Sequence, residues 1–136
     1  MNRVIAAVIL AGFGAQLVKL IVYFFKHKEL HIHDLIVTGG MPSSHSAFVV
    51  ALSTIIFLEE GASTAFAISL VLALITLRDA FGVRRTVGEE GLILTTIIKK
   101  LKLKEKTHIA IGHTPTQVAV GSIIGFLTAL GVHFLF

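Results

Sequence analysis

The chain alternates long apolar runs with short polar stretches. Four apolar runs cover residues 4–25, 43–58, 62–81 and 115–136. At about 1.5 Å per residue, runs of some 20 residues cross a hydrocarbon core of about 30 Å, and the run 43–58 is short for a span. The pattern therefore predicts membrane-spanning helices. A soluble all-helical protein is the structural alternative, and the lipid-length runs favour the membrane interpretation.

A fifth segment, residues 91–103, mixes apolar residues with lysines. Its apolar members are Leu92, Ile93, Ile97, Ile98 and Leu101, and its lysines, with the next one along, are Lys99, Lys100, Lys102 and Lys104. This pattern predicts an amphipathic helix at the membrane interface, in contact with anionic lipid. The predicted fold is all-α: one domain over residues 1–136, a polytopic membrane helical bundle with about four spans and one interfacial helix.

Composition supports a membrane protein. Hydrophobic residues make up 54% of the 136 residues and charged residues 15%, against about 25% charged in soluble domains. The absence of cysteine excludes disulfides and thiolate metal sites. The net charge is +4, and the basic residues that produce it lie in the gaps between apolar runs. This distribution favours an anionic membrane surface or a phosphate-bearing substrate over nucleic acid as the partner.

The ends of the chain and the basic residues predict a topology. One basic residue, Arg3, precedes a first run that continues to Phe25, which suits a retained span better than a cleaved signal. With four spans, the loops after the first and third lie on one side. They hold most basic residues, namely Lys26, Lys28, Arg84, Arg85, Lys99, Lys100, Lys102, Lys104 and Lys106. We therefore expect an integral protein of the bacterial inner (plasma) membrane with this side cytoplasmic and both termini outside.

Polar motifs gather at that same side. One motif (39–46) precedes the second run, one (78–85) ends the third, and one (112–117) opens the fourth. Lys19 lies near the matching end of the first run, three residues after Gln16 and therefore on the same helix face. Four segments far apart in sequence are predicted to meet at one membrane face.

The residue types in these motifs suit phosphoryl transfer. His45 and His113 both stand where a helix is expected to begin, among arginines and lysines. One neutral imidazole can attack phosphorus to form a covalent intermediate, and the other can protonate the leaving oxygen. The cations neutralise the phosphoryl oxygens, while helix N-termini and the Ser43 and Ser44 hydroxyls offer donors. Such a scheme needs no metal and no cofactor.

The motifs resemble a known family. Pro42-Ser43-Ser44-His45 is similar to the Pro-Ser-Gly-His motif of the PAP2 superfamily of lipid phosphatases and vanadium haloperoxidases. The fuller pattern resembles its divergent PAP2 branch of small membrane proteins. It comprises Gln16-x-x-Lys19, His33-Asp34-Leu35, Gly39-Gly40-Met41-Pro42-Ser43-Ser44-His45-Ser46-Ala47, Asp79-Ala80-x-Gly82-Val83-Arg84-Arg85 and Gly112-His113-Thr114-Pro115.

The resemblance implies a role for each matching residue. His113 corresponds to the nucleophile and His45 to the general acid. Lys19 and Ser43 correspond to phosphate-binding residues, and Ser44 is expected beside them. Where the PAP2 pattern has an arginine this chain has Thr107, so Arg84 or Arg85 is expected to supply the charge.

One position departs from the pattern at the nucleophile itself. Four residues after His113, where the PAP2 pattern has an orienting aspartate, this chain has Gln117. Its neutral amide is expected to orient the ring, although it stabilises an imidazolium poorly. Asp79, Glu89 or Glu90 is expected to supply a carboxylate from another helix, with Asp79 as the catalytic candidate.

Alternatives remain at several points. His31-x-His33-Asp34 could bind a metal, although such residues in a polar loop are more often solvated. Gly121-x-x-x-Gly125 is predicted to pack inside the bundle rather than to form a dimer seam, while a homodimer stays open. A lipid-phosphate binder or transporter, a structural subunit and a haloperoxidase are the rivals to a phosphatase of phosphatidylglycerophosphate or polyprenyl phosphate.

Overall fold

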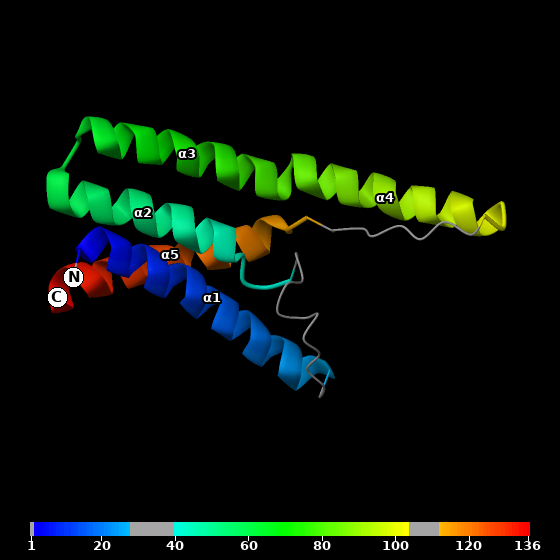
Figure 1. The fold of residues 1–136 in the computed structure, drawn as a ribbon, viewed down its shortest axis with the longest axis horizontal. Coiled ribbons are helices and arrows are strands. Elements are labelled where there is room, and N and C mark those ends of the chain that lie inside the picture. The colour runs from blue at the N-terminus through cyan, green and yellow to red at the C-terminus, as the bar shows by residue number, and fades with distance from the viewer. Residues whose placement is uncertain (1, 28–39, 104–111) are drawn as a thin grey trace.

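The computed structural model describes residues 2–27, 40–103 and 112–136. These residues form five helices and no strand: α1 (Arg3–His27), α2 (Ser44–Glu60), α3 (Thr64–Phe81), α4 (Val83–Lys100) and α5 (Pro115–Leu135). Figure 1 shows α1, α2, α3 and α5 as a bundle and α4 extending beyond it. The predicted all-α fold is confirmed, and each apolar run forms a helix within a few residues of its expected bounds.

Three stretches of the described chain are long and apolar enough to cross a membrane. They are Arg3–Phe25, Thr64–Lys100 (which joins α3 to α4) and Pro115–Leu135. The fourth expected span, α2, has 17 residues, or about 26 Å of helix, slightly less than the hydrocarbon thickness of about 30 Å. It thus lies at the short end of the range for a membrane span, and it occupies the centre of the bundle.

The bundle is held together by small residues on closely packed helices. α2 packs against α1, α3 and α5, and the buried core is built largely of alanines, with Ile55 the largest fully buried side chain. A Cβ atom on Gly121 or Gly125 of α5 would overlap the backbone carbonyl of Ser43 or Ala47. Since small residues allow such backbone contact in lipid, the predicted internal role of these two glycines is confirmed.

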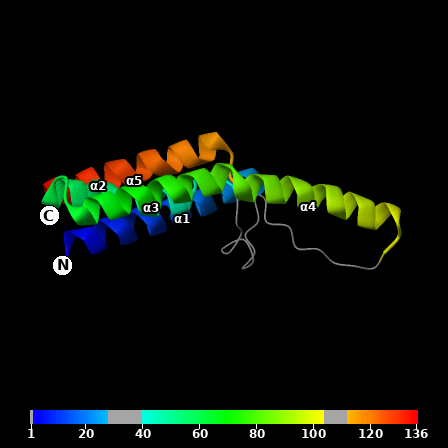
Figure 2. The ribbon, with the colours of Figure 1, turned by 90° about the horizontal axis from the view of Figure 1, so that it is seen from above.

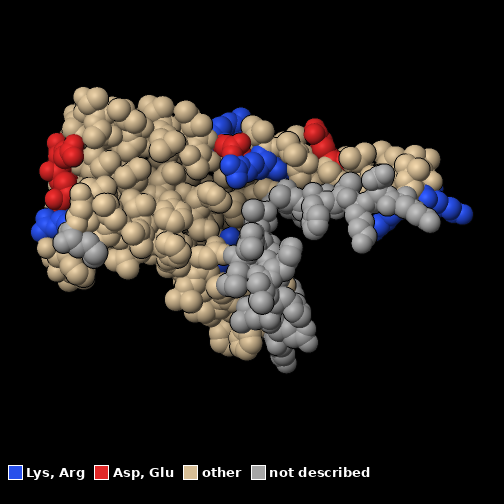
Figure 3. Space-filling model, in the orientation of Figure 1, with Lys and Arg blue, Asp and Glu red and all other residues tan. Residues whose placement is uncertain are grey.

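Large apolar side chains face outward instead of inward. Phe13, Ile68 and Leu127 are each more than half exposed. On the face drawn in Figure 3, charged residues occur at the ends of the bundle and along α4, and the flank between them is uncharged. An apolar exterior around a core of small residues is the arrangement expected when lipid is the solvent.

Both termini lie at one end of the bundle (Figure 1). There Glu59 of α2 accepts hydrogen bonds from Arg3 of α1 at 3.2 Å and from His133 of α5 at 2.8 Å. This cluster ties three helices together at the end away from the polar motifs, as the predicted topology requires.

The helix predicted to lie at the interface is longer than expected. It begins at Val83, so Arg84 and Arg85 form its first turn instead of a polar connection. The Gly82 N–H donates to the Arg78 carbonyl, and the Gly82 carbonyl accepts from Thr86. Hydrogen bonding of helical type thus continues across the junction, and α4 follows roughly the axis of α3 (Figures 1 and 2).

Candidate active site

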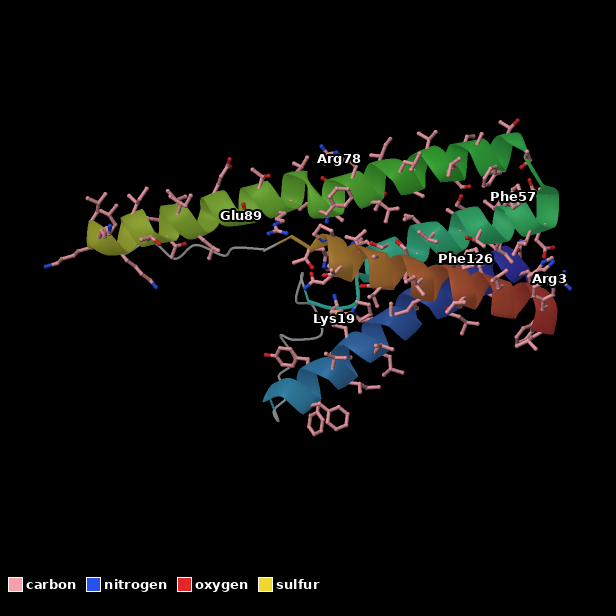
Figure 4. The ribbon with its side chains drawn as sticks, turned by 180° about the vertical axis from the view of Figure 1, so that it is seen from behind. Arg3, Lys19, Phe57, Arg78, Glu89 and Phe126 are labelled. Atoms are coloured by element: carbon pink, nitrogen blue, oxygen red, sulfur yellow. The ribbon has the colours of Figure 1, made fainter. Side chains whose placement is uncertain are left out.

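The polar motifs meet at the end of the bundle opposite the termini. The Ser43 N–H donates to the Gln117 carbonyl at 3.2 Å, and the His113 N–H donates to the Ala80 carbonyl at 3.1 Å. These backbone bonds join the segment before α2, the end of α3 and the start of α5. Lys19 on α1 points toward the same region (Figure 4). The predicted convergence of four segments is confirmed.

His113 is held by the first turn of α5. Its Nδ1 lies 3.2 Å from Oε1 of Gln117, and the same oxygen accepts the Thr114 N–H at 3.0 Å. Thr114 caps the helix in return by accepting the Gln117 N–H, which completes a capping box. Because an amide oxygen only accepts, Nδ1 carries the proton and Nε2 keeps its lone pair.

The surroundings of His113 favour its neutral form. Its side chain is buried, and this burial is the main cause that lowers its pKa below the ordinary value. Hydrogen bonds to Gln117 and to the Gly40 carbonyl oppose the shift, whereas the positive charges of Lys19 and His45 add to it. At neutral pH the ring is therefore uncharged, as a nucleophile must be.

Lys19 and Gln16 share the face of α1 that turns toward the site. Lys19 is only 8% exposed, and its charge acts on both His45 and His113. One turn earlier, Gln16 Oε1 accepts a hydrogen bond from the Ser44 hydroxyl at 3.1 Å. A buried lysine inside a membrane helix is a functional candidate by default, and the predicted shared face is confirmed.

The two serines before His45 differ in what they can do. Ser43 is fully buried, and its Oγ caps α2 by accepting the Ser46 N–H and the Ser46 hydroxyl. In this structure the Ser43 hydroxyl therefore has a structural role, and its expected contact with phosphate stays a prediction. Ser44 is half-buried and bonds to Gln16 across the helix pair, which leaves it as the serine hydroxyl beside the site.

His45 occupies an exposed position on the first turn of α2. It lies within electrostatic range of Arg84 and Lys19. The two histidines thus differ in environment, because His113 is buried and His45 is open to the surroundings.

The arginines of the site are paired with carboxylates. Arg84 donates to Asp79 across the α3–α4 junction, and Arg85 donates to Glu89 one turn further along α4 at 3.0 Å. Asp79 therefore contacts Arg84, while the hydrogen bond to His113 comes from Gln117. Asp79, the carboxylate expected beside His113, contacts the Arg84 guanidinium instead.

Arg78 does not belong to the site. Its guanidinium lies 5.6 Å from the centre of the Phe81 ring, and its side chain points away from the bundle in Figure 4.

The expected contact of Gln117 with His113 is present, whereas its capping box and the close approach at Gly112 were not predicted. A Cβ atom on Gly112 would overlap the backbone of Arg84 and Arg85, so this glycine brings the 112–114 segment against the start of α4. The pattern Thr114-x-x-Gln117 matches a capping box, which explains why the Gln117 side chain is held in place as an acceptor. The close approach at Gly112 has no comparable local signal.

Some predicted residues lie outside the described part of the chain. His31, His33 and Asp34 of the metal alternative belong to this group, as does Thr107. Within residues 2–27, 40–103 and 112–136, no three histidine, aspartate or glutamate side chains are grouped to hold a metal ion.

Comparison with known proteins agrees with the motifs. A family model described as the divergent PAP2 family matches residues 1–128. The chain belongs to the divergent PAP2 family. It is also 36% identical, over 90% of its own length and 88% of the relative's, to a Bacillus subtilis (strain 168) protein named "Uncharacterized membrane protein YuiD". No solved structure shows a significant match. The chain is thus a divergent PAP2 integral membrane protein.

Proposed function

We propose that this divergent PAP2 protein is a metal-independent phosphatase that hydrolyses a lipid phosphate through a phosphohistidine on His113. The observation that carries the proposal is the state of His113. The ring is buried and neutral, its Nδ1–H is held by Gln117, and Lys19 and His45 lie close enough to act on it.

In the first step, Nε2 of His113 attacks phosphorus. An N–P bond forms as the bond between phosphorus and the lipid oxygen breaks. His45, in its protonated form, gives its proton to that oxygen, so the lipid leaves as an alcohol. The step requires the neutral tautomer in which Nδ1 carries the proton and Nε2 its lone pair, and this is the tautomer that the contact with Gln117 favours.

In the second step, neutral His45 removes a proton from a water molecule. The water oxygen attacks phosphorus, the N–P bond breaks, and inorganic phosphate leaves with His113 neutral again. The exposed position of His45 suits this exchange of protons with water. Lys19, Arg84 and Arg85 neutralise the phosphoryl oxygens in both steps, and Ser44 adds a hydroxyl donor.

The position of the site favours a lipid substrate. The histidines lie at one end of a bundle whose flanks are apolar, so a phosphate head group can reach them while its tail stays in the bilayer. With the site on the cytoplasmic side, phosphatidylglycerophosphate is the expected class. With the opposite orientation, a polyprenyl phosphate is expected.

A second candidate is a non-catalytic protein that binds or transports lipid phosphate. It is favoured by Gln117, because a neutral amide orients the imidazole but stabilises an imidazolium less than a carboxylate would. Both candidates predict that Lys19 and the arginines bind phosphate, and only the phosphatase requires turnover.

Phosphate release from a panel of lipid phosphates in nanodiscs tests the proposal. Wild type and His113→Ala are compared in parallel, with Arg3→Gln at the opposite end of the bundle as the matched control. We expect release by wild type and Arg3→Gln and loss in His113→Ala. Equal release by His113→Ala would exclude His113 as nucleophile, and binding without release by any protein would favour the non-catalytic candidate.

A further inference from the structure

The distal segment of α4 and its cap, residues 91–103, differs from the rest of the structure in how it is supported. The first half of α4 is braced by the Arg84–Asp79 pair and by Gly112 against its backbone. Among the described helices, α4 packs mainly on α3, across the junction between them. The distal segment therefore extends beyond the bundle (Figures 1 and 2).

This segment carries an exposed apolar stripe. Leu94, Ile97 and Leu101 recur at three- and four-residue intervals, so they lie on one helix face. Their exposures are 52%, 47% and 64%. A helix of this length is only marginally stable in water unless its apolar face is covered. We therefore expect the stripe to pack against another surface.

The same segment is exclusively basic. Residues 91–103 contain three lysines and no acidic residue, and Lys99, Lys100 and Lys102 are all exposed. In Figure 3 the far end of α4 carries basic atoms, while the acidic atoms on α4 lie nearer the bundle. An apolar stripe flanked by lysines is typical of a helix that lies in the headgroup region of a membrane.

We propose that the 91–103 segment docks on the anionic lipid surface of the bilayer that holds the bundle. Leu94, Ile97 and Leu101 enter the boundary between headgroups and acyl chains, and the lysines contact lipid phosphates. Anionic lipid complements this charge, whereas a second copy of the segment presents the same positive charge.

Docking requires the distal segment to bend away from the direction that α4 shares with α3 in this structure, and two glycines lie where such a bend can form. Gly88 and Gly91 lie between the braced half of α4 and the distal segment. Glycine has the lowest helix propensity after proline, and helix kinks occur at such residues. A bend at these glycines would leave Arg84 and its partner Asp79 in place. Docking does not depend on the proposed phosphatase activity.

Environment-sensitive fluorophores on single cysteines test this proposal in the full-length protein. Because the natural chain has no cysteine, Ile97→Cys on the stripe and Thr96→Cys on the polar face can each be labelled alone. The proteins are placed one per nanodisc, in phosphatidylcholine alone or mixed with phosphatidylglycerol. We expect a blue shift at position 97 that needs phosphatidylglycerol and is absent at position 96.

Charge variants supply the control. Lys99→Gln, Lys100→Gln and Lys102→Gln together should weaken docking by roughly fivefold for each lysine removed, and the three Lys→Arg changes should preserve it. A position-97 spectrum that is the same in both lipid mixtures would overturn the proposal. A shift seen only when two copies share a nanodisc would also overturn it, because the occupant would then be a second copy.

Discussion

Nδ1 of His113 lies 3.2 Å from Oε1 of Gln117, an oxygen that also accepts the Thr114 N–H. One amide therefore caps α5 and selects the tautomer of the buried histidine. Because this hydrogen bond also affects the pKa of His113, substitutions of Gln117 can test its role.

Replacing Gln117 should move the pKa of His113 in opposite directions. Gln117→Glu keeps the capping box and places a carboxylate on Nδ1, which favours the imidazolium and raises the pKa of His113. Gln117→Ala removes a hydrogen bond that raises this pKa, so the value should fall. NMR titration of His113 measures both.

The pH profile of phosphate release gives a second readout of the same change. Neutral His113 attacks phosphorus, so activity falls as pH drops through its pKa. The acid limb of kcat/KM should lie at higher pH in Gln117→Glu than in wild type, and at lower pH in Gln117→Ala. Shifts of the same sign in both variants would contradict the assigned contact.

Substitutions of Ser43 and Ser44 should have different effects, one on protein stability and the other on phosphate binding. Ser43→Ala removes the cap of α2, and loss of an N-cap costs about 1 kcal/mol, so the unfolding temperature in detergent should fall. Ser44→Ala should leave that temperature nearly unchanged and weaken phosphate binding. If Ser43→Ala lowered binding at unchanged stability, the capping role of Ser43 would be wrong.

The stability lost on replacing a glycine of α5 by alanine should depend on what lies against that glycine. Gly121→Ala and Gly125→Ala place a methyl group against the backbone of α2, and such overpacking costs about 1–3 kcal/mol. Gly131→Ala meets open space in the same helix, so it should be neutral or slightly stabilising. Thermal unfolding in detergent compares all three. Equal losses for the three variants would argue against the α2–α5 contact.

Asp79 should act through Arg84. Arg84→Ala removes a cation from the developing phosphoryl charge and should lower kcat/KM by about 100-fold. Asp79→Asn only frees that cation from a partly exposed ion pair, and exposed pairs contribute about 0–1 kcal/mol, so a loss of at most about fivefold is expected. The double variant should match Arg84→Ala alone. A larger loss for Asp79→Asn than for Arg84→Ala would place Asp79 in direct contact with the reacting groups.

The membrane bundle and the residues that gather at one end of it were predictable from the sequence. Lipid imposes a minimum length of apolar helix and an apolar exterior, and both requirements act on consecutive residues. The runs that became α1, α3 and α5 are therefore visible without any knowledge of packing. Because successive spans cross the membrane in opposite directions, Lys19, His45 and His113 come to the same face of the membrane.

What each polar group contacts was decided by the tertiary structure. The close approach of α5 to α2 at Gly121 buries Ser43 as a cap and leaves Ser44 beside Gln16. Helical bonding across Gly82 turns Asp79 toward Arg84, and Gln117 takes the place beside His113. These outcomes depend on distances of a few ångströms between segments far apart in sequence. The apolar pattern sets which residues share an end of the bundle, and only the packing of its helices sets which of them touch.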